Sequence, residues 1–253
     1  PIVQTYPAGP GLYAMMARRH MHEYGTTREQ LAHVAVKNHK HGSMNPVAQY
    51  RREISIEAVL SAPEVSSPLG LFDCAPLSDG AAALVLCPHK ISRRFTDTPI
   101  KIIGSGHATD TIALHDRRDI CTMDATVLAG KRALHKAKKL PKDIDFAEVH
   151  DNFTISEIMA IEDLRLVPKG QGGAVTQEGQ TYVGGKIPVN TSGGLKARGN
   201  PLGATGVAQV VEVVHQLRGD AEKRQVSGAK TALTHAVGGT GATAVVHIFE
   251  RGD

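Results

Sequence analysis

Three polar segments of the sequence combine histidine or asparagine with neighbouring glycine, proline or aromatic residues. They read HDNF at 150–153, GNPLGATG at 199–206 and THAVGG at 234–239. Imidazole is the side chain whose ordinary pKa best suits proton transfer near neutral pH, and an amide nitrogen donates hydrogen bonds. These residue types are therefore suited to acid–base chemistry and to stabilising a negative charge that develops on a substrate.

Each segment also has a plainer interpretation. Asn152 or Thr154 would cap the next helix while His150 is simply a buried imidazole, and the local sequence favours this interpretation. The glycine-rich segment 199–206 fits tight helix–sheet packing as well as it fits a ligand that approaches the backbone. His235 is one of 13 histidines, so its position at a strand end proves little alone.

The elements that must position these segments alternate along the chain. Short apolar stretches predict strands, and apolar residues at helical spacing predict helices between them. This alternation predicts a layered α/β fold. The predicted elements are the strands 100–108, 146–150, 186–190, 231–237 and 242–250, the helices 125–138 and 155–166, and a helix with Val207, Val210, Val211 and Val214 on one face.

The predicted strands also suggest where a ligand would bind. In an open α/β sheet the ligand crevice lies beyond the carboxyl ends of the strands, where the loops meet. His150 ends one predicted strand, His235 lies near the end of another, and Asn200 precedes a helix. We therefore expect these three residues to converge on one pocket.

The first hundred residues give weaker signals. A helix is predicted at 12–24, and Thr26 with Glu29 resembles the capping box of a second helix. The stretch GAAALVLCP at 80–88 is short and apolar between glycine and proline, which predicts a fully buried strand. Further along the chain, the glycine-rich stretch 170–185 predicts a loop.

Composition narrows the class of protein. A hydrophobic content of 41% supports a folded core, and no stretch approaches the roughly 20 consecutive apolar residues of a membrane span. The N-terminal residues lack the layout of a signal peptide, so a cytoplasmic location is expected. The net charge of +4 is scattered, which favours a phosphate-bearing small molecule over nucleic acid as ligand. Three cysteines without metal-ligand spacing predict no metal site.

Longer stretches of the sequence resemble the C-terminal half of thiolases. They include AEVHDNF, GGKIPVNTSGGLKARGNPLGATG and LTHAVGGTGATAVVHIFE, which are similar in particular to the sterol carrier protein x and archaeal acetyl-CoA acetyltransferase branches. The resemblance implies a thiolase-like layered α/β fold. Residues 1–98 would form the loop region and the last part of the first thiolase domain, and residues 99–253 a complete C-terminal domain with five strands.

The resemblance also implies roles for individual residues. His150 stands where the sterol-carrier branch has the histidine of its HDCF motif, which implies oxyanion binding. Asn200 replaces the histidine of the GHP motif, the base that activates the nucleophilic cysteine, and an amide cannot accept a proton near neutral pH. His235 takes the position of the second catalytic cysteine, as it does in that branch. Further substrate contacts are implied for Asn152, Phe153, Gly194, Pro201 and Gly238.

Three functional hypotheses remain open at this point. The first is a thiolase-type acyl-CoA acyltransferase subunit or fragment, similar to acetyl-CoA C-acetyltransferase, that forms or cleaves a 3-ketoacyl-CoA. The second is a cysteine-independent relative, such as a retro-aldolase subunit acting on CoA thioesters, which would fit Asn200. The third is a non-catalytic subunit that binds acyl-CoA or serves as a scaffold.

The nucleophilic cysteine of such a site is expected in a first domain that precedes this sequence, because no cysteine here matches its motif. Whether the chain is itself an enzyme is thus left open. A coenzyme A thioester would be the substrate, and no cofactor is implied. The implied partners are acetyl-CoA or another acyl-CoA, a second copy or a partner chain that supplies the first domain, and an OB-fold and zinc-ribbon protein associated with acyl-CoA.

Overall fold

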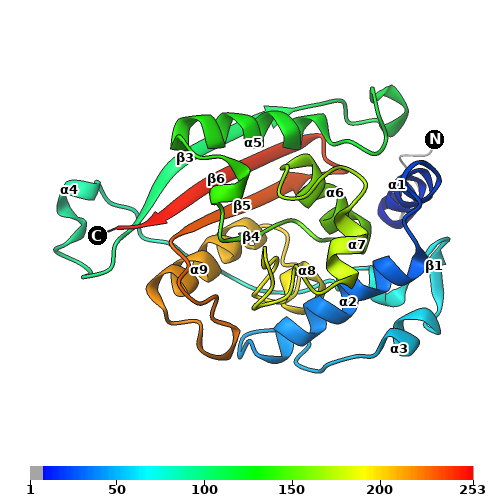
Figure 1. Cartoon of the computed structure of the whole chain (residues 1–253), viewed down its shortest axis with the longest axis horizontal. Coiled ribbons are helices and arrows are strands. Elements are labelled where there is room, and N and C mark those ends of the chain that lie inside the picture. Colours follow the sequence, from blue (N-terminus) through cyan, green and yellow to red (C-terminus); the bar gives the residue numbers. More distant parts are fainter. Residues whose placement is uncertain (1–7, 253) are drawn as a thin grey trace.

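The computed structural model describes residues 8–252 and contains a four-stranded mixed sheet (Figure 1). Its strands are β3 (Ile100–Thr109), β4 (Phe146–Glu148), β5 (Thr231–Gly238) and β6 (Thr243–Arg251), in the order β3-β6-β5-β4. β6 runs antiparallel to both β3 and β5, whereas β4 runs parallel to β5. The carboxyl ends of β4 and β5 therefore meet at one edge of the sheet, as the sequence predicts.

The fifth predicted strand is reduced to a single bridge. Val189 pairs in parallel with Ala147 of β4. The Ala147 N–H donates to the Pro188 carbonyl at 3.0 Å, and the Ala147 carbonyl accepts from the Asn190 N–H at 2.8 Å. Pro188 has no N–H with which to lengthen the ladder, and Asn190 turns away with a φ of 54°. The C-terminal unit thus has four strands instead of five, with one extended residue beside β4.

Two helices cover opposite faces of the sheet, α5 (Asp124–Ala137) and α9 (Thr205–Arg218) (Figure 1). α5 packs on β3 and β6, and α9 packs on β5 and β6. β3 can approach α5 closely because Gly104 and Gly106 carry no side chain. An added β-carbon at either glycine would collide with a backbone carbonyl of α5.

The main hydrophobic core lies between the sheet, α5 and α6 (Thr154–Asp163). Leu233 of β5 and Ile248 of β6 are fully buried on this face. The next residue along β6, Phe249, points to the other face and packs with α9, as the alternation of side chains along a strand requires. Every residue of α6 is buried, because α6 is surrounded by α5 and by the helices α1 (Ala8–Tyr24), α2 (Arg28–Ser43) and α7 (Gly172–Gln177).

The N-terminal part of the described chain contains two long helices, which pack against α6 and the elements around it. The second helix of this part, α2, contacts α6 and the two short helices α7 and α8 (Gly194–Ala197) that follow α6 in the chain. No helix within residues 8–252 combines the length and apolarity needed to cross a membrane. The remaining elements are α3 (Ile56–Leu60), β1 (Glu64–Ser66), β2 (Leu69–Gly70), η2 (Leu71–Asp73), α4 (His89–Ser92), η3 (Leu114–Asp116), η4 (Pro141–Asp143) and η5 (Glu222–Arg224).

Two local predictions were wrong in detail. The N-cap of α2 is Thr27, not Thr26, and its capping box is closed by Gln30. The side chain of Thr27 accepts from the Gln30 backbone, and the Gln30 side chain accepts from the Thr27 backbone, so two unpaired donors are satisfied. The stretch 170–185 is not only loop, because it contains the short helix α7.

The inward face of α9 also differs from the prediction. The four valines at helical spacing are only partly buried, whereas Gln209, Glu212 and Gln216 are almost fully buried. Gln209 Nε2 donates to the His235 carbonyl at 3.0 Å, and Glu212 pairs with Arg224. These bonds satisfy polar groups whose burial would otherwise be unfavourable, so tertiary partners decide which face of α9 turns inward.

The predicted strand 80–88 does not form. The segment has no regular structure, and Val85 and Leu86 are 98% and 74% exposed. A strand needs a neighbour for its backbone N–H and C=O groups, and no described strand runs alongside this segment. The prediction of a buried strand is therefore wrong for the described chain, although the apolar residues that prompted it are present.

Candidate active site

The ends of β4 and β5 bring two predicted residues, His150 and His235, into contact. The His150 backbone N–H donates to His235 Nδ1 at 3.5 Å, and Thr126 Oγ1 of α5 lies 2.9 Å from His235 Nε2. Because Nδ1 accepts, the proton of the neutral ring belongs on Nε2, which then donates to Thr126. Burial lowers the pKa of His235 to about 3, so the ring is neutral and a weak base near neutral pH.

His150 is the more accessible of the two histidines. The residue as a whole is partly exposed, yet its Nδ1 is buried and has no hydrogen-bond partner among the described residues. Burial, and then the nearby Arg198 guanidinium, lowers the pKa of His150 to about 4. A neutral imidazole with one ring nitrogen free of protein contacts can bind a ligand oxygen without first losing a proton.

Asn200 lies between α8 and α9, and other residues hold it in place. Its backbone N–H donates to Ser78 Oγ at 3.0 Å, and its Oδ1 accepts from Thr205 Oγ1 at 3.0 Å. This arrangement leaves the amide Nδ2 as the end available to a ligand. Asn200 makes no direct hydrogen bond to His150 or His235 in the described chain, so a pocket shared by all three stays a prediction.

Asn152 and Phe153 have structural contacts of their own. Asn152 Oδ1 accepts from Ser156 Oγ at 2.8 Å. The N-cap of α6 is Phe153 and no side chain caps the helix, so the predicted capping by Asn152 or Thr154 is wrong. Phe153 is almost fully buried and stacks on Tyr13 with ring centroids 4.5 Å apart. Contacts of these two residues with a substrate stay a prediction.

The three remaining predicted residues make structural contacts within the chain. Gly194 has a φ of 59°, and an added β-carbon there would collide with the Asp151 carboxylate. Asp151 needs this closeness because its Oδ1 accepts from Leu195 N–H at 2.7 Å at the start of α8. Pro201 covers Gly80, and Gly238 closes β5 at the turn into β6. The structure thus gives Gly194 a packing reason that is independent of any ligand.

Two buried ion pairs behind the site were missed from the sequence. Arg198 Nη1 lies 3.5 Å from Glu148 Oε2, and Arg224 binds Glu212 with its Nε 3.0 Å from Oε1. Burial and the neighbouring Glu212 raise the pKa of Glu148 to about 7. The sequence did contain one sign of a buried ion pair, because Glu148 is a charged residue inside the otherwise apolar strand FAEVH.

A second missed feature is the buried polar contact of α2 with the HDNF segment. Asn38 Nδ2 donates to Asp151 Oδ2 at 2.7 Å and to Glu157 Oε2 at 2.9 Å, and Lys37 Nζ lies 3.0 Å from Glu157 Oε1. Burial, followed by Glu157, raises the pKa of Asp151 to about 6. Nothing in the local sequence distinguishes Lys37 and Asn38 from solvent-facing residues of a helix.

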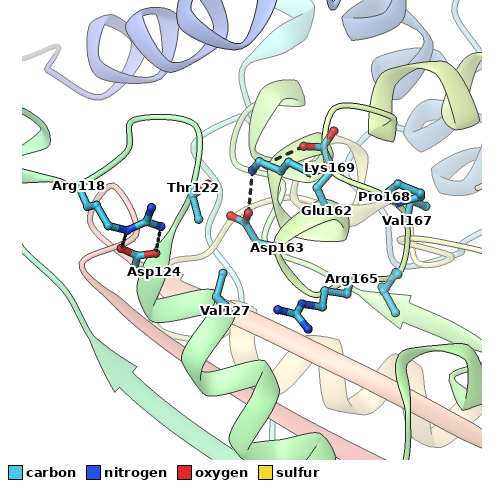
Figure 2. Close-up of a pocket in the computed structure, with 11 residues that line it drawn as sticks. Arg118, Thr122, Asp124, Val127, Glu162, Asp163, Arg165, Val167, Pro168 and Lys169 are labelled. Carbon is cyan, nitrogen blue, oxygen red and sulfur yellow. Dashed lines mark hydrogen bonds and ion pairs between the residues drawn. The ribbon is translucent and has the colours of Figure 1, made fainter. Parts of the chain in front are cut away.

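A separate pocket lies between α5 and the loop after α6 (Figure 2). Lys169 Nζ lies 2.8 Å from Asp163 Oδ1, and Arg118 is paired with Asp124. Arg165 points into the space between α5 and this loop in Figure 2. None of the predicted site residues lines this pocket, so it is distinct from the strand-end site.

One group of side chains qualifies the prediction of no metal site. Glu23, Asp119 and Cys121 have potential ligand atoms within 4.8 Å of one another. Burial raises the pKa of Cys121 to about 12, which keeps the thiol protonated. A metal ion binding here would have to displace the thiol proton, so binding would depend on pH.

The chain is similar to known proteins along almost all of its length. An acetyl-CoA acetyltransferase from Methanothermobacter thermautotrophicus is 59% identical over 242 residues, which make up 96% of this chain and 63% of that protein. Sterol carrier protein 2 from Homo sapiens is 37% identical over 255 residues, which make up 99% of this chain and 46% of that protein. The chain thus spans between about half and two thirds of these relatives.

Solved structures agree with these relatives. The structure described as "Ltp2-ChsH2(DUF35) aldolase" matches with a TM-score of 0.86 and 27% identity, over 97% of this chain and 64% of that one. A monomeric SCP2-thiolase like protein from Mycobacterium smegmatis matches with a TM-score of 0.72 over 98% of this chain and 53% of that one, and at 19% identity it supports the fold alone. Residues 106–251 match the family "Thiolase C-terminal domain-like", and this chain belongs to that family.

Proposed function

We propose that this chain forms the second half of a thiolase-type active site, which binds an acyl-CoA thioester and stabilises its oxygen as negative charge develops there. The observation that carries the proposal is the contact at neighbouring strand ends between the His150 backbone N–H and the His235 ring, which leaves the neutral His150 imidazole without a partner at Nδ1 among the described residues. Fixed hydrogen-bond donors in a site sheltered from water stabilise a developing charge without having to reorganise.

His150 and Asn200 have different parts in this proposal. His150 donates a hydrogen bond to the thioester oxygen, and Asn200 adds a second one from Nδ2. Removing a single donor of this kind typically slows a reaction by about 10²- to 10³-fold. Asn200 does not activate a nucleophile, because its amide cannot accept a proton. His235 orients His150 through the backbone contact and remains neutral.

The attacking thiolate comes from a first domain, on the same polypeptide or on a partner chain. Burial raises the pKa of Cys74 to about 11 and that of Cys121 to about 12, so both thiols stay protonated. Cys87 is exposed in the segment 80–88. The apolar residues of that segment support the same proposal, because a first-domain sheet would supply the backbone partners that they lack here.

A second candidate is cleavage of a carbon–carbon bond in a CoA thioester by a retro-aldol reaction, which needs no cysteine nucleophile. One observation favours it: Asn200 replaces the base that a cysteine would need. The likeness to the aldolase structure, which extends over 97% of this chain, is compatible with it. In this reaction His150 and Asn200 would hold the thioester oxygen of the enolate that leaves as the bond breaks.

Asn200→His separates the two candidates. In the protein combined with a cysteine-bearing first domain, a restored base should raise acyl transfer by more than about 10²-fold, the low end of general-base effects. The assay follows free CoA thiol as a 3-ketoacyl-CoA is formed or cleaved. The chain alone should show negligible activity before and after the substitution.

Asn200→Gln is the matched control, because it keeps the amide and should give no gain. The thiolase proposal is wrong if Asn200→His gives no increase while the unsubstituted protein cleaves a 3-hydroxyacyl-CoA by the retro-aldol route. Loss of both activities with retained acyl-CoA binding would instead support the non-catalytic subunit.

A further inference from the structure

Arg117 is a buried cation that has no anionic partner among residues 8–252. It lies in the loop between β3 and α5, and only 8% of the residue is exposed. Its one side-chain hydrogen bond runs from Nη2 to Thr240 Oγ1 at 3.1 Å. Its Nε and Nη1 are buried without a partner, and no carboxylate of the described chain lies within ion-pair distance.

Two other arginines near the sheet have largely buried side chains, and each lies next to a carboxylate. Arg224 makes three hydrogen bonds to the Glu212 carboxylate, and Arg198 lies beside Glu148. Burying a charge is strongly unfavourable unless an opposite charge and hydrogen bonds compensate it. Arg198 Nη2 also lacks a hydrogen-bond partner among the described residues, but Arg198 and Arg224 each have a carboxylate beside them, whereas Arg117 has none. The unpaired charge of Arg117 therefore points to an anion that binds from outside the described chain.

The nearest acidic residues are already engaged. Asp110 and Asp124 both act on the Arg117 charge from a distance, but neither is hydrogen-bonded to it. Asp124 holds Arg118 through two hydrogen bonds, and Asp110 Oδ1 accepts from Thr111 N–H at 2.7 Å. A small shift of either carboxylate towards Arg117 would therefore break a contact that it now makes.

A chain of contacts links Arg117 to the segment that carries His150. Thr240, its hydrogen-bond partner, belongs to the turn that follows β5. The neighbouring Gly239 carbonyl accepts from the Tyr13 hydroxyl at 3.2 Å, and the Tyr13 ring stacks on Phe153 of the HDNF segment. One aromatic ring thus separates the turn beside Arg117 from the segment that carries His150.

We propose that Arg117 binds a carboxylate carried by the acyl group of the substrate, so that the preferred substrates are acyl-CoA thioesters whose acyl chain ends in a carboxylate. This inference rests on the proposed function, because it assumes that the thioester lies at His150. A planar guanidinium with free N–H groups matches a carboxylate in shape and charge. The small exposed fraction of Arg117 suits a slim acyl end better than the bulky phosphates of CoA.

The test compares two esters of the same chain length, glutaryl-CoA and valeryl-CoA, which differ in a terminal carboxylate against a methyl group. Binding to the full protein, with its first domain, is measured by titration calorimetry. The unsubstituted protein should bind glutaryl-CoA roughly 10- to 100-fold more tightly, as expected for hydrogen bonds to a charged group. Arg117→Met should remove this preference and leave valeryl-CoA binding unchanged.

Two further variants make the result specific. Arg117→Lys keeps the charge and should restore part of the preference. Arg118→Met removes the neighbouring arginine, which is exposed and paired with Asp124, and should alter neither ester. Without ligand, Arg117→Met should melt at the same or a higher temperature than the unsubstituted protein, because it removes an unpaired buried charge.

The outcomes distinguish failure of this inference from failure of the proposed function. If the unsubstituted protein binds neither ester, the proposed function is wrong. If it binds both equally, the inference is wrong and the function stands. Equal weakening of both esters by Arg117→Met would mean that Arg117 contacts the CoA moiety, and a lower melting temperature would mean that it has a structural partner. Either result overturns the inference.

Discussion

The strand β5 and the segment 80–88 are both short apolar stretches next to glycine, but the structure treats them in opposite ways. β5 lies between β6 and β4, and Leu233 at its centre is fully buried. In the segment 80–88, Leu86 is 74% exposed and no described strand runs alongside. The two stretches have similar residues, so the difference comes from their neighbours. An apolar stretch indicates that a segment can form a buried strand, but the strand forms only where neighbouring strands pair with its backbone.

The largest expected effect comes from matched truncations in the two regions. Leu233→Ala should lower the free energy of unfolding by about 2–5 kcal/mol, because it leaves a cavity in the core. Leu86→Ala should change it by less than about 0.5 kcal/mol, because the side chain is already largely in water. Urea unfolding of both variants measures the difference. A large loss for Leu86→Ala would show that this segment packs against the folded unit in solution.

A smaller effect tests whether the N-terminal helices belong with the folded unit. His41 of α2 lies 3.0 Å from the Asn190 carbonyl and accepts from Val183 N–H at 3.1 Å, so it joins α2 to the C-terminal unit. Burial lowers the pKa of His41 to about 3, whereas the unfolded chain has the ordinary value of about 6.5. The unfolded state therefore takes up a proton first as the pH falls, and stability is lost between about pH 6.5 and 3.

His41→Gln should make this loss less steep by at most about 1.4 kcal/mol per pH unit. The measurement is the free energy of unfolding at several pH values between about 4 and 7. His115→Gln serves as the control, because His115 is exposed. The pKa values of Glu148 and Asp163 are raised to about 7 and about 6, so these two carboxyl groups favour the folded state as the pH falls. Both groups are present in each variant, so their contribution cancels when the slopes are compared. Parallel curves for His41→Gln and the unsubstituted protein would contradict the prediction.

The smallest expected effect concerns the backbone of the exposed segment. Amide protons at 81–87 should exchange rapidly in the chain alone, because they lack strand partners. Addition of a first domain should slow this exchange by about tenfold or more, while the amides of β5 change less. Hydrogen exchange followed by mass spectrometry measures both regions at once. Protection of 81–87 in the chain alone would mean that copies of the chain pair through this segment.

Much of the fold could be predicted from the sequence where local pattern and burial agree. β3, β5 and β6 were predicted to within two residues, because each has an apolar stretch and a sheet neighbour within the chain. The fifth strand was not, because Pro188 and the left-handed Asn190 shorten it. The inward face of α9 was also wrong, since Glu212 is buried by a partner 12 residues further along the chain, Arg224.

The site could be predicted only in part. The contact between His150 and His235 follows from two parallel strands that end at the same edge of a sheet. The position of Asn200 depends on Ser78, which is 122 residues away, and no local pattern contains that information. Arg117 escaped prediction for a similar reason, because the sequence shows an arginine pair and only the structure shows that one member is buried without a partner.

The tripeptide His150-Asp151-Asn152 has a practical consequence for mutational scanning. Asp151, the middle residue, is fully buried. Its carboxylate accepts hydrogen bonds from the Asn38 side chain and from two backbone N–H groups of α8. An alanine scan would therefore report activity losses at adjacent positions that have unrelated origins. A loss at Asp151 would reflect a displaced α8, whereas under the proposed function a loss at His150 would reflect a missing hydrogen bond to the substrate. A residue-by-residue scan would show the two losses as one apparent motif.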